Sequence, residues 1–337
     1  MEKLRIPFST LQEVLAKVLS HNHFTPERAE LSARLFAQSS LDGVPSHGLN
    51  RFLSYLSFVR RGLIHPDSRP EVMAKFGAFE RWDGGLGPGN LNAYQAMGKA
   101  IEMAKEFGLG CVALQNTNHW MRAGNYGWQA VDEGCIGICF TNTKPNMPAW
   151  GGNEPKLGNN PLVVGIPREK GAVVLDMAMS QFAYGKMAIY AKEGKQLSYD
   201  GGFDGEGNLT KSPKDILEKE LALPIGLWKG AGLSLVLDML SVVLSGGQAT
   251  FEVGKSGDEY GLSQVFVAVN PLKFGMEKWM DERLDGIVDD LKISGVFGGK
   301  GSVRYPGEHT LKVRQENLEL GVPVDMDIWS EILKLVE

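Results

Sequence analysis

The stretch CVALQNTNHW, residues 111–120, joins an apolar run of strand length to a polar turn. Four similar apolar runs follow it: IGICFTN at 136–142, PLVVGIP at 161–167, GAVVLDMA at 171–178 and SQVFVAVN at 263–270. Short apolar runs bounded by turn residues are typical of buried strands. We therefore predict a sheet that occupies the middle of the chain.

Helical patterns flank these runs. Ser9 with Gln12 predicts a capping box for one helix, and Thr25 followed by Pro26 opens a second. Ser46 is expected to cap a third helix that ends at Gly62. Further helices are expected at 92–107, 230–244, 276–292 and 324–336. The prediction is an α/β (mixed α+β) fold, in which residues 1–75 and about 305–337 form a discontinuous helical region and residues 76–304 a sheet-rich region.

The composition argues against nucleic-acid and membrane partners. The 337 residues carry a net charge of -5, the pI is about 5.8, and no long basic run occurs. This balance disfavours binding to phosphate backbones or to anionic lipid. The longest apolar run, GLSLVLDMLSVVL at 232–244, is interrupted by Asp238 and Ser241. A membrane span needs about 18 apolar residues, so we do not expect one here.

The cysteines predict a cytoplasmic protein with free thiols. There are three, Cys111, Cys135 and Cys139, and the N-terminal residues lack the apolar run of a secretory signal. Cys135 and Cys139 lie in an apolar segment without the second cysteine pair that a zinc site would need. We therefore expect buried, inert thiols and no metal.

Three common motifs are absent. The sequence contains no G-x-x-x-x-G-K-[ST], no H-E-x-x-H and no G-x-G-x-x-G. The nearest approach to the last motif, GLGCVA at 108–113, opens a strand after a helix, which is the wrong context for a dinucleotide. A nicotinamide cofactor, if bound, would need a different binding mode.

His47 and Arg51 stand out in SHGLNRF, residues 46–52. On a helix that starts at Ser46 they would share a face, because four residues bring the chain to within about 40° of the same side. The apolar stripe of the same helix would lie opposite, at Leu49, Phe52, Leu53, Leu56 and Val59. A histidine placed only for packing should lie in that stripe. The residues alone leave two interpretations of His47 and Arg51 open: a solvated pair on the surface, or a functional pair.

The functional interpretation of this pair is recognition of a 2-oxo acid. Free N–H groups at a helix start, beside Ser46, attract a carboxylate, and the Arg51 guanidinium suits bidentate carboxylate binding. The His47 imidazole titrates near neutrality and can protonate a carbonyl oxygen. A 2-oxo acid presents both groups on adjacent carbons.

Other polar residues follow the predicted strands. Asn118 and His119 should emerge at a strand end, where α/β sites form, whereas Asn116 is better explained as a turn residue. Asn159 and Asn160 could line a cavity with amides. Asp176 could orient an imidazole, accept from a ribose hydroxyl or cap a helix. Lys229, at the start of an apolar helix, suits a phosphate or a tight turn.

Six motifs occur in the order seen in a known family. They are SHGLNRF (46–52), NTNHW (116–120), LGNNP (157–161), LDMAMS with AYGK (175–186), WKGAGLSL (228–235) and PGEH (306–309). Nearly the whole chain thereby resembles the malate/L-lactate dehydrogenase family that lacks a Rossmann domain. The resemblance implies a lactate/malate/sulfolactate dehydrogenase-like fold, an oxidoreductase of 2-oxo and 2-hydroxy acids that uses NAD(H) or NADP(H), and a homodimer.

The resemblance also implies roles for individual residues. His47 becomes the proton donor and Arg51 the carboxylate ligand. Beyond the resemblance, we expect the helix start at Ser46 to help hold the carboxylate and Asn118 or His119 to help fix the carbonyl. The implied cofactor segments are Ala172, Val173, Val174, Leu175, Asp176, Met177, Ala178, Trp228, Lys229, Gly307, Glu308 and His309. Glu308 and His309 stand in the opposite order from the most similar relatives, so their separate roles stay open.

Three stretches favour one substrate within the family. NHWMRAGNYGWQA (118–130), IGICFTN and DGGFDGEGNLTK (200–211) resemble members that reduce 2,3-diketo-L-gulonate to 3-dehydro-L-gulonate. Malate, L-lactate and ureidoglycolate are the alternative substrates. A non-enzymatic binding protein is disfavoured, because both His47 and Arg51 are present.

Overall fold

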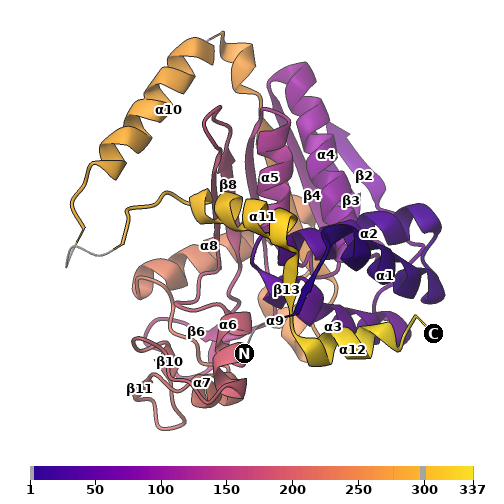
Figure 1. Ribbon diagram of the computed structural model, residues 1–337, viewed down its shortest axis with the longest axis vertical. Helices are drawn as coiled ribbons and strands as arrows, with labels where there is room; N and C mark the ends of the chain where they lie inside the picture. Colours follow the sequence, from indigo (N-terminus) through magenta and orange to yellow (C-terminus); the bar gives the residue numbers. More distant parts are fainter. Residues whose placement is uncertain (1–3, 276, 297–300, 337) are drawn as a thin grey trace.

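The computed structural model describes residues 4–275, 277–296 and 301–336 (Figure 1). Its centre is a seven-stranded sheet in the order β2-β3-β4-β12-β5-β8-β9. The strands are β2 (Glu71–Phe76), β3 (Phe79–Asp83), β4 (Leu109–Thr117), β12 (Leu262–Val269), β5 (Ile136–Thr141), β8 (Leu162–Ile166) and β9 (Val173–Met177). All five apolar runs named from the sequence form strands of this sheet.

The sheet is mixed and mainly antiparallel. β3 and β4 run parallel, and every other neighbouring pair within this sheet is antiparallel. A doubly wound Rossmann sheet is parallel, so this topology is of a different kind. It agrees with the absence of the glycine fingerprint and with the predicted mixed α/β class.

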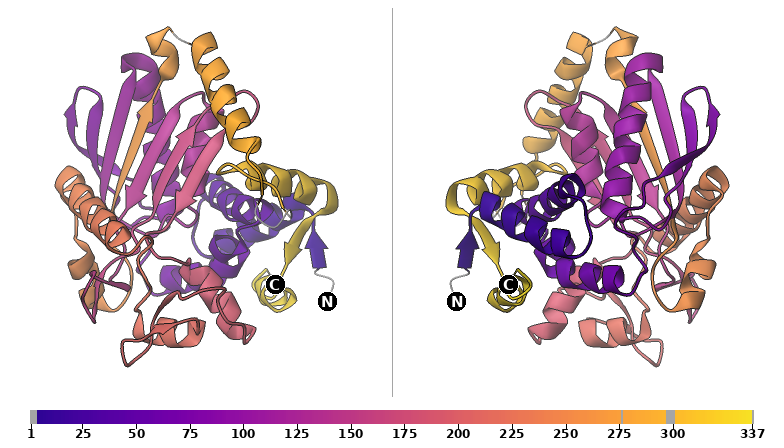
Figure 2. Two further views of the ribbon diagram at one scale, coloured as in Figure 1. Left: turned by 90° about the vertical axis from the view of Figure 1, so that its left-hand side faces the viewer. Right: turned by 90° about the vertical axis from the view of Figure 1, so that its right-hand side faces the viewer.

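Helices cover both faces of the sheet (Figure 2). α4 (Gly89–Phe107) and α5 (Gly124–Asp132) pack on one face, where the buried cluster contains Met97, Tyr126 and Phe266. α8 (Trp228–Ser245) packs on the other face against β12, β4 and β5. The carboxyl ends of β4 and β9 therefore belong to a sheet that is covered by helices on both faces.

A helical unit lies beside the sheet. It contains α1 (Phe8–His21), α2 (Pro26–Leu41), α3 (Leu49–Arg60), α12 (Met326–Leu333) and the antiparallel pair β1 (Leu4–Ile6) and β13 (Val322–Val324), with α11 (Glu308–Leu320) packed on α2. Its core joins Leu15, Phe36 and Phe52 to Val322 and Trp329. Segments from both ends of the sequence thus share one core, although the predicted domain boundaries themselves stay a prediction.

A third group of elements lies below the sheet in Figure 1. It contains α6 (Tyr184–Lys192), α7 (Pro213–Lys219) and the short pairs β10 (Gly202–Phe203) with β11 (Leu209–Thr210) and β6 (Met147–Pro148) with β7 (Pro155–Leu157). α9 (Thr250–Val253) follows α8, and α10 (Glu277–Lys292) extends away from the sheet. Arg168 Nη1 and Lys170 Nζ hold α10 through Asp285, each at 2.7 Å.

The cysteines lie as the sequence predicts. Cys135 and Cys139 are fully buried, Cys111 is half-buried, and all three are free. Burial raises the pKa of the Cys111 thiol to about 11, which makes it unreactive at neutral pH. Among the described residues no group of three His, Cys, Asp or Glu side chains is placed to hold a metal.

Two helix starts were predicted wrongly. α1 begins at Phe8 behind Pro7, without a side-chain cap, so Ser9 and Gln12 form no capping box. Ser46 does not cap α3, because Pro45–His47 form a separate 3₁₀ turn and α3 starts after Gly48. α11, which begins at Glu308, lies within the region predicted to be helical at about 305–337, but its pattern did not identify it as a separate helix.

Candidate active site

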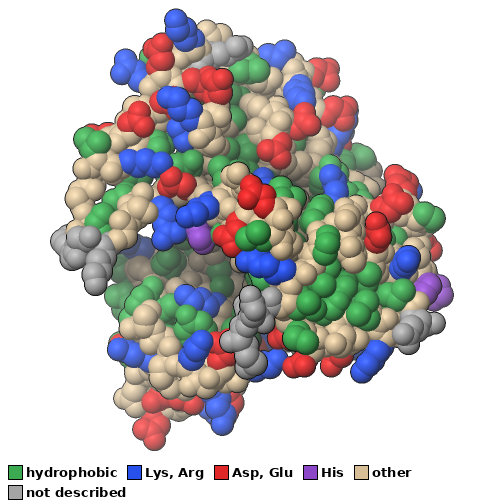
Figure 3. Space-filling model, viewed as in Figure 1, with side chains coloured by type: hydrophobic (Ala, Val, Ile, Leu, Met, Phe, Trp, Pro, Cys, Tyr) green, Lys and Arg blue, Asp and Glu red, His purple; other side chains and the backbone are tan. Residues whose placement is uncertain are grey.

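A cavity of about 650 Å³ lies where the helical unit, the strand ends and α6 meet. Its wall includes the 43–47 turn, Arg51, residues 119–123, Asp176, and residues 183–186, 189 and 190. In the space-filling view the surface is hollowed between α11 and the lobe that carries α6 and α7 (Figure 3). The volume falls within the range of about 300–1,000 Å³ found for small-molecule sites.

His47 is held at the cavity by a tight turn. Gly48 lies directly on α2, where a Cβ atom would stand 2.3 Å from Ser40 Oγ, so only glycine fits. The Leu49 N–H donates to Ser40 Oγ at 2.9 Å, which fixes the turn to α2. Ser46 Oγ lies 3.2 Å from His47 Nδ1, and this leaves Nε2 as the nitrogen for a ligand.

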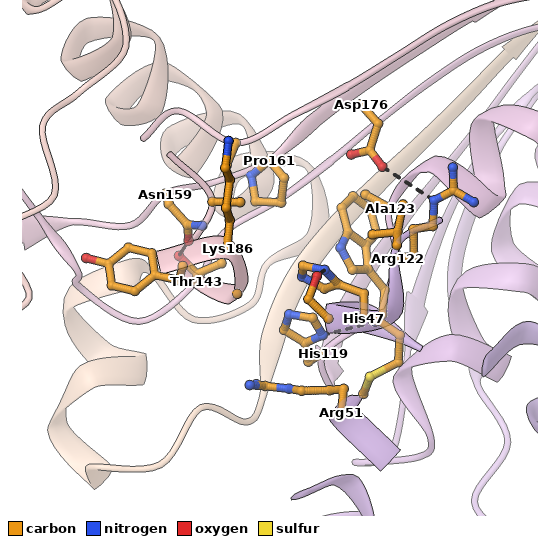
Figure 4. Close-up of a pocket in the computed structure, with 18 of the residues that line it drawn as sticks. His47, Arg51, His119, Arg122, Ala123, Thr143, Asn159, Pro161, Asp176 and Lys186 are labelled. Carbon is orange, nitrogen blue, oxygen red and sulfur yellow. Dashed lines mark hydrogen bonds and ion pairs between the residues drawn. The ribbon is translucent and has the colours of Figure 1, made fainter. Parts of the chain in front are cut away.

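His119 lies against His47 in the same wall (Figure 4). The ring centroids are 5.9 Å apart and the planes differ by 15°. The Met121 N–H donates to His119 Nδ1 at 3.0 Å, so the neutral ring carries its proton on Nε2. Burial, with the charge of Arg51 and then of His47, holds the pKa of His119 well below its usual value. His119 is therefore a neutral hydrogen-bond donor at physiological pH.

The pKa of His47 is also lowered. Burial is the main cause, the charge of Asp176 acts in the opposite direction, and the charges of Arg51 and Arg122 lower it further. The two histidines thus differ in one respect that matters for chemistry: only His47 faces a carboxylate that stabilises its protonated form.

Arg51 extends its guanidinium into the cavity from the first turns of α3 (Figure 4). Within the described part of the chain its side chain makes no ion pair. A half-buried guanidinium without an ion pair, beside two imidazoles, can bind an anion. The sequence argument placed His47 and Arg51 on one helix face. They instead come from a 3₁₀ turn and the following helix, yet line the same cavity.

A buried ion network supports the opposite end of this wall. Arg122 is 4% exposed and binds Asp42, which also accepts from Arg314 Nε at 2.7 Å and Arg314 Nη2 at 2.9 Å. Burial would raise the pKa of Asp42, but the hydrogen bonds and charges of the two arginines outweigh it and hold the pKa low. Arg122 Nε faces Asp176 Oδ2 at 3.9 Å and has no hydrogen-bond partner among the described residues.

Asp176 joins the network to the cavity. Its Oδ2 accepts from the Gly124 N–H at 2.9 Å, at the first residue of α5. A Cβ atom at Gly124 would lie 2.6 Å from the same oxygen, so glycine permits this approach. Asp176 thereby caps a helix from another element and keeps part of its carboxylate in the cavity wall.

Polar groups form the facing wall (Figure 4). Asn159 Oδ1 accepts from Thr143 Oγ1 at 3.1 Å and from Asn146 Nδ2 at 2.9 Å. Lys144 Nζ binds Glu220 Oε1 at 2.5 Å. Lys186 lies on α6 with its Nζ 5.3 Å from the Phe182 ring centroid and 5.5 Å from that of Tyr190.

Two predicted amides act as braces. Asn118 lies outside the large cavity and is 1% exposed. Its Nδ2 donates to the carbonyl oxygens of Leu63, Leu86 and Gly87, so it braces these segments, and its contact with substrate stays a prediction. Asn160 is fully buried and binds Thr143 N and Ser234. Asn116 adopts a φ of 51° and donates to Asp83, as a turn residue should.

The proposed cofactor segments lie partly together. The Val174 N–H donates to the Pro306 carbonyl at 3.0 Å, which brings residues 172–178 beside the 307–309 segment. The Ile225 N–H donates to the Met179 carbonyl at 2.8 Å, so the chain leading to Trp228 and Lys229 passes the other end of β9. Of these residues Asp176 and Ala178 line the cavity, whereas Trp228 is 63% exposed and Glu308 binds Lys292.

Several residues of the cavity were not predicted from the sequence. Arg122, Lys144, Lys186, Glu220 and Glu259 all line it. Arg122 and Lys186 stand inside quoted motifs and could have been proposed on that ground. The other three come from separate loops, and no spacing relates them.

Comparison with known proteins extends these observations. Residues 6–333 match the family model described as malate/L-lactate dehydrogenase. Over 333 residues, 98% of this chain and 100% of the relative, the sequence is 42% identical to a 2,3-diketo-L-gulonate reductase of Citrobacter koseri. The corresponding protein of Klebsiella pneumoniae is 41% identical over the same shares of the two chains.

Solved structures agree with the fold. A malate dehydrogenase from Entamoeba histolytica matches with a TM-score of 0.93 and 28% identity, over 99% of this chain and 97% of that chain. A sulfolactate dehydrogenase from Methanocaldococcus jannaschii matches with a TM-score of 0.90 and 29% identity, over 98% and 96%. The predicted non-Rossmann fold is thereby confirmed.

Proposed function

Because the chain belongs to the malate/L-lactate dehydrogenase family, we propose that it reduces the 2-oxo group of 2,3-diketo-L-gulonate with NADH or NADPH. The enzyme class predicted from the sequence is confirmed: it is an oxidoreductase of 2-oxo and 2-hydroxy acids, from a family that uses nicotinamide cofactors. The particular substrate, the choice of cofactor and the roles of single residues are the proposal.

The observation that carries the mechanism is the convergence of His47, His119 and Arg51 on one cavity wall. The Arg51 guanidinium binds the C1 carboxylate through two parallel hydrogen bonds. The His119 Nε2–H donates to the C2 carbonyl oxygen and polarises it, because the ring is held neutral with Nδ1 occupied. These two contacts fix the reacting carbon relative to the wall.

His47 is the proton donor. As negative charge develops on the C2 oxygen, the His47 imidazolium gives its Nε2 proton to that oxygen, and the ring becomes neutral. Ser46 Oγ, at 3.2 Å from Nδ1, fixes the ring orientation, so Ser46 is a positioning residue. In the oxidation of a 2-hydroxy acid His47 removes the same proton.

A nicotinamide cofactor fits the wall between Asp176 and Lys186. A bound dihydronicotinamide would supply the hydride to C2. Arg122 Nε is a buried donor without a partner among the described residues, and the Asp176 carboxylate opposite it is an acceptor. Such a pair suits a hydroxyl or amide group of the cofactor. Residues 172–178 and 307–309 would form the rest of this side.

A substrate panel tests the proposal. The purified protein should oxidise NADH or NADPH with 2,3-diketogulonate faster than with pyruvate or oxaloacetate, monitored by nicotinamide absorbance. A preference for oxaloacetate would favour malate as the product and overturn the substrate assignment alone. Failure to bind either dinucleotide in a fluorescence titration would contradict the mechanism as well.

We also propose a homodimer formed through α8. This helix exposes Val236 at 48%, Met239 at 57% and Val243 at 78%, and such a contiguous apolar face is typical of an interface. By length and composition α8 could span a membrane, and a third of it is buried. However, it packs on the sheet, and its Asp238 binds Asn142 and the Thr250 N–H. A second copy is therefore the better occupant of this face.

The test of the dimer is its mass. Met239→Glu with Val243→Lys should convert a dimer to a monomer in light scattering. Leu209→Glu, at a residue that is 54% exposed on the distant β11, is the control and should leave the mass unchanged. An unaltered mass in the double variant would place the interface elsewhere. The cytoplasmic location stays a prediction from the sequence.

A further inference from the structure

The cavity wall beyond Arg51 carries two carboxylates. Glu259 lines both the large cavity and a small adjoining one that also touches Arg51. Its Oε2 accepts from the Lys144 N–H at 3.2 Å. Glu220, the residue after α7, also lines the large cavity. Arg51 and His47 are proposed to bind the C1 carboxylate and the C2 carbonyl of the substrate. Both glutamate side chains therefore face the part of the substrate that extends beyond these two groups.

Two cations of the cavity, Lys144 and Arg122, are already paired with carboxylates. Lys144 Nζ binds Glu220 Oε1 at 2.5 Å, and Arg122 binds Asp42. The Lys186 ammonium lies over the rings of Phe182 and Tyr190 on the α6 side. A substrate with a second carboxylate needs a second uncompensated cation. Among the residues that line the described cavity, Lys186 is the one such cation besides Arg51, and it lies on the side proposed for the nicotinamide.

The same wall offers alternating donors and acceptors. Lys144 donates and Glu220 accepts, and Asn159, held by Thr143 and Asn146 through its Oδ1, keeps its Nδ2 for a ligand. A hydroxyl group both donates and accepts, so a chain of hydroxyls satisfies such a wall. Burial raises the pKa of Glu259, against the lowering charge of Arg51. An ionised glutamate repels a carboxylate tail, and in either protonation state it can accept a hydrogen bond from a hydroxyl.

We propose that Lys144, Glu220 and Glu259 form a specificity subsite that accepts a neutral, hydroxylated substrate tail and excludes a second carboxylate. This inference rests on the proposed function. It assigns the discrimination between hydroxylated and dicarboxylate 2-oxo acids to these side chains. The Lys144–Glu220 pair is the decisive element, because it neutralises the lysine that would otherwise bind a dicarboxylate.

The variant that tests the subsite is Glu220→Gln. It keeps the size of the side chain and frees the charge of Lys144. The ratio of kcat/KM for oxaloacetate to that for 2,3-diketogulonate should rise about 10- to 100-fold, the scale of one charged hydrogen bond. Lys144→Met should lower kcat/KM for 2,3-diketogulonate without raising it for oxaloacetate.

The matched control is Glu218→Gln. Glu218 lies on the exposed side of α7, pairs with Lys219 at 3.3 Å and does not line the cavity. The control should leave the ratio unchanged. If Glu220→Gln unfolds, as circular dichroism would reveal, Glu259→Gln replaces it, with a rise of the ratio again expected.

Measurements with pyruvate distinguish a failure of the specificity subsite from a failure of the proposed function. Pyruvate has neither a hydroxylated tail nor a second carboxylate, so it does not reach the changed contacts. Its kcat/KM in Glu220→Gln and in Lys144→Met should therefore stay within about threefold of the wild-type value. A wild-type protein that reduces no 2-oxo acid contradicts the proposed function. A wild-type protein that reduces pyruvate, with a ratio that does not move in the charge variants, overturns the subsite alone.

Discussion

The imidazole rings of His47 and His119 lie nearly parallel, with centroids 5.9 Å apart, although they come from a turn after α2 and from the end of β4. The groups that neighbour the two rings give them different chemical roles. His119 has its Nδ1 occupied by the Met121 N–H, whereas His47 faces the charge of Asp176. One ring is thereby fixed as a neutral donor, and the other can exchange a proton.

Replacement of His47 by asparagine tests the proton donor. His47→Asn should lower kcat about 10²–10⁴-fold, the usual scale of general acid–base catalysis, because the alkoxide then takes its proton from water. Cofactor affinity, measured by fluorescence titration, should stay unchanged. His21→Asn, at the exposed end of α1, is the control. Near-normal turnover of His47→Asn would remove this residue from the mechanism.

Arg51 should act mainly in substrate binding. Arg51→Met removes the guanidinium and should reduce kcat/KM for a 2-oxo acid about 10²–10³-fold, as expected when a charged partner is lost. Arg51→Lys keeps the charge but not the planar fork, and should recover only part of this loss. The two variants are compared in steady-state kinetics. Equal kcat/KM values in the two variants would mean that the fork geometry has no role.

The pH profile of the oxidation reaction reports on His47. The base must be neutral, and burial lowers the pKa of His47 from its ordinary value of 6.5. As pH rises through this lowered pKa, kcat/KM for the 2-hydroxy acid should rise and then level off, with a midpoint below 6.5. Asp176→Asn removes the charge that favours the protonated ring, so it should move the midpoint still lower. A midpoint that rises in this variant would contradict the assignment.

Asp42 should be a large contributor to stability. Asp42→Asn leaves Arg122 and Arg314 buried against a neutral amide, and should cost about 3–5 kcal/mol of unfolding free energy at pH 7. Because the pKa of Asp42 is lowered in the folded state, its stabilising effect is present above the unfolded pKa near 4. It is lost as pH falls through the folded value.

Urea unfolding at two pH values measures this effect. The difference between wild type and Asp42→Asn should be full at pH 7 and should shrink below about pH 4. Gln38→Ala is a milder control, since Gln38 Nε2 donates to the same carboxylate at 2.8 Å without a charge. A difference that does not vary with pH would mean that the carboxylate charge is not what stabilises the fold.

Much of the architecture could be predicted because its signals are local. The five strands named from apolar runs, and the helices around Pro26, Ala96, Leu237 and Trp329, follow from periodicity and from turn residues. The edge strand β2 and its neighbour β3 were missed, since EVMAKF and FERWD alternate polar and apolar residues weakly. α11 was not identified as a separate helix because its sequence has little amphipathic character.

The site could be predicted only where its residues lie close in sequence. His47 and Arg51 were identified together because they are close in sequence, His47 in a 3₁₀ turn and Arg51 in the helix that follows it. The helix cap assigned to Ser46 failed because packing of Gly48 on α2 overrides the local preference for a capping serine. Lys144, Glu220 and Glu259 meet only through tertiary structure, and no spacing could have joined them.

The pairing of β1 with β13 has a consequence for synthesis of the protein. The core that begins with α1 and α2 is completed by Val322, Trp329 and Ile332, which are synthesised after the strands of the sheet. The helices on either side of His47, α2 and α3, should therefore stay partly unpacked while the sheet is synthesised and folds. Catalytic competence should arise as a late event, and nascent chains that stall before residue 322 should need chaperone protection for this first helical segment.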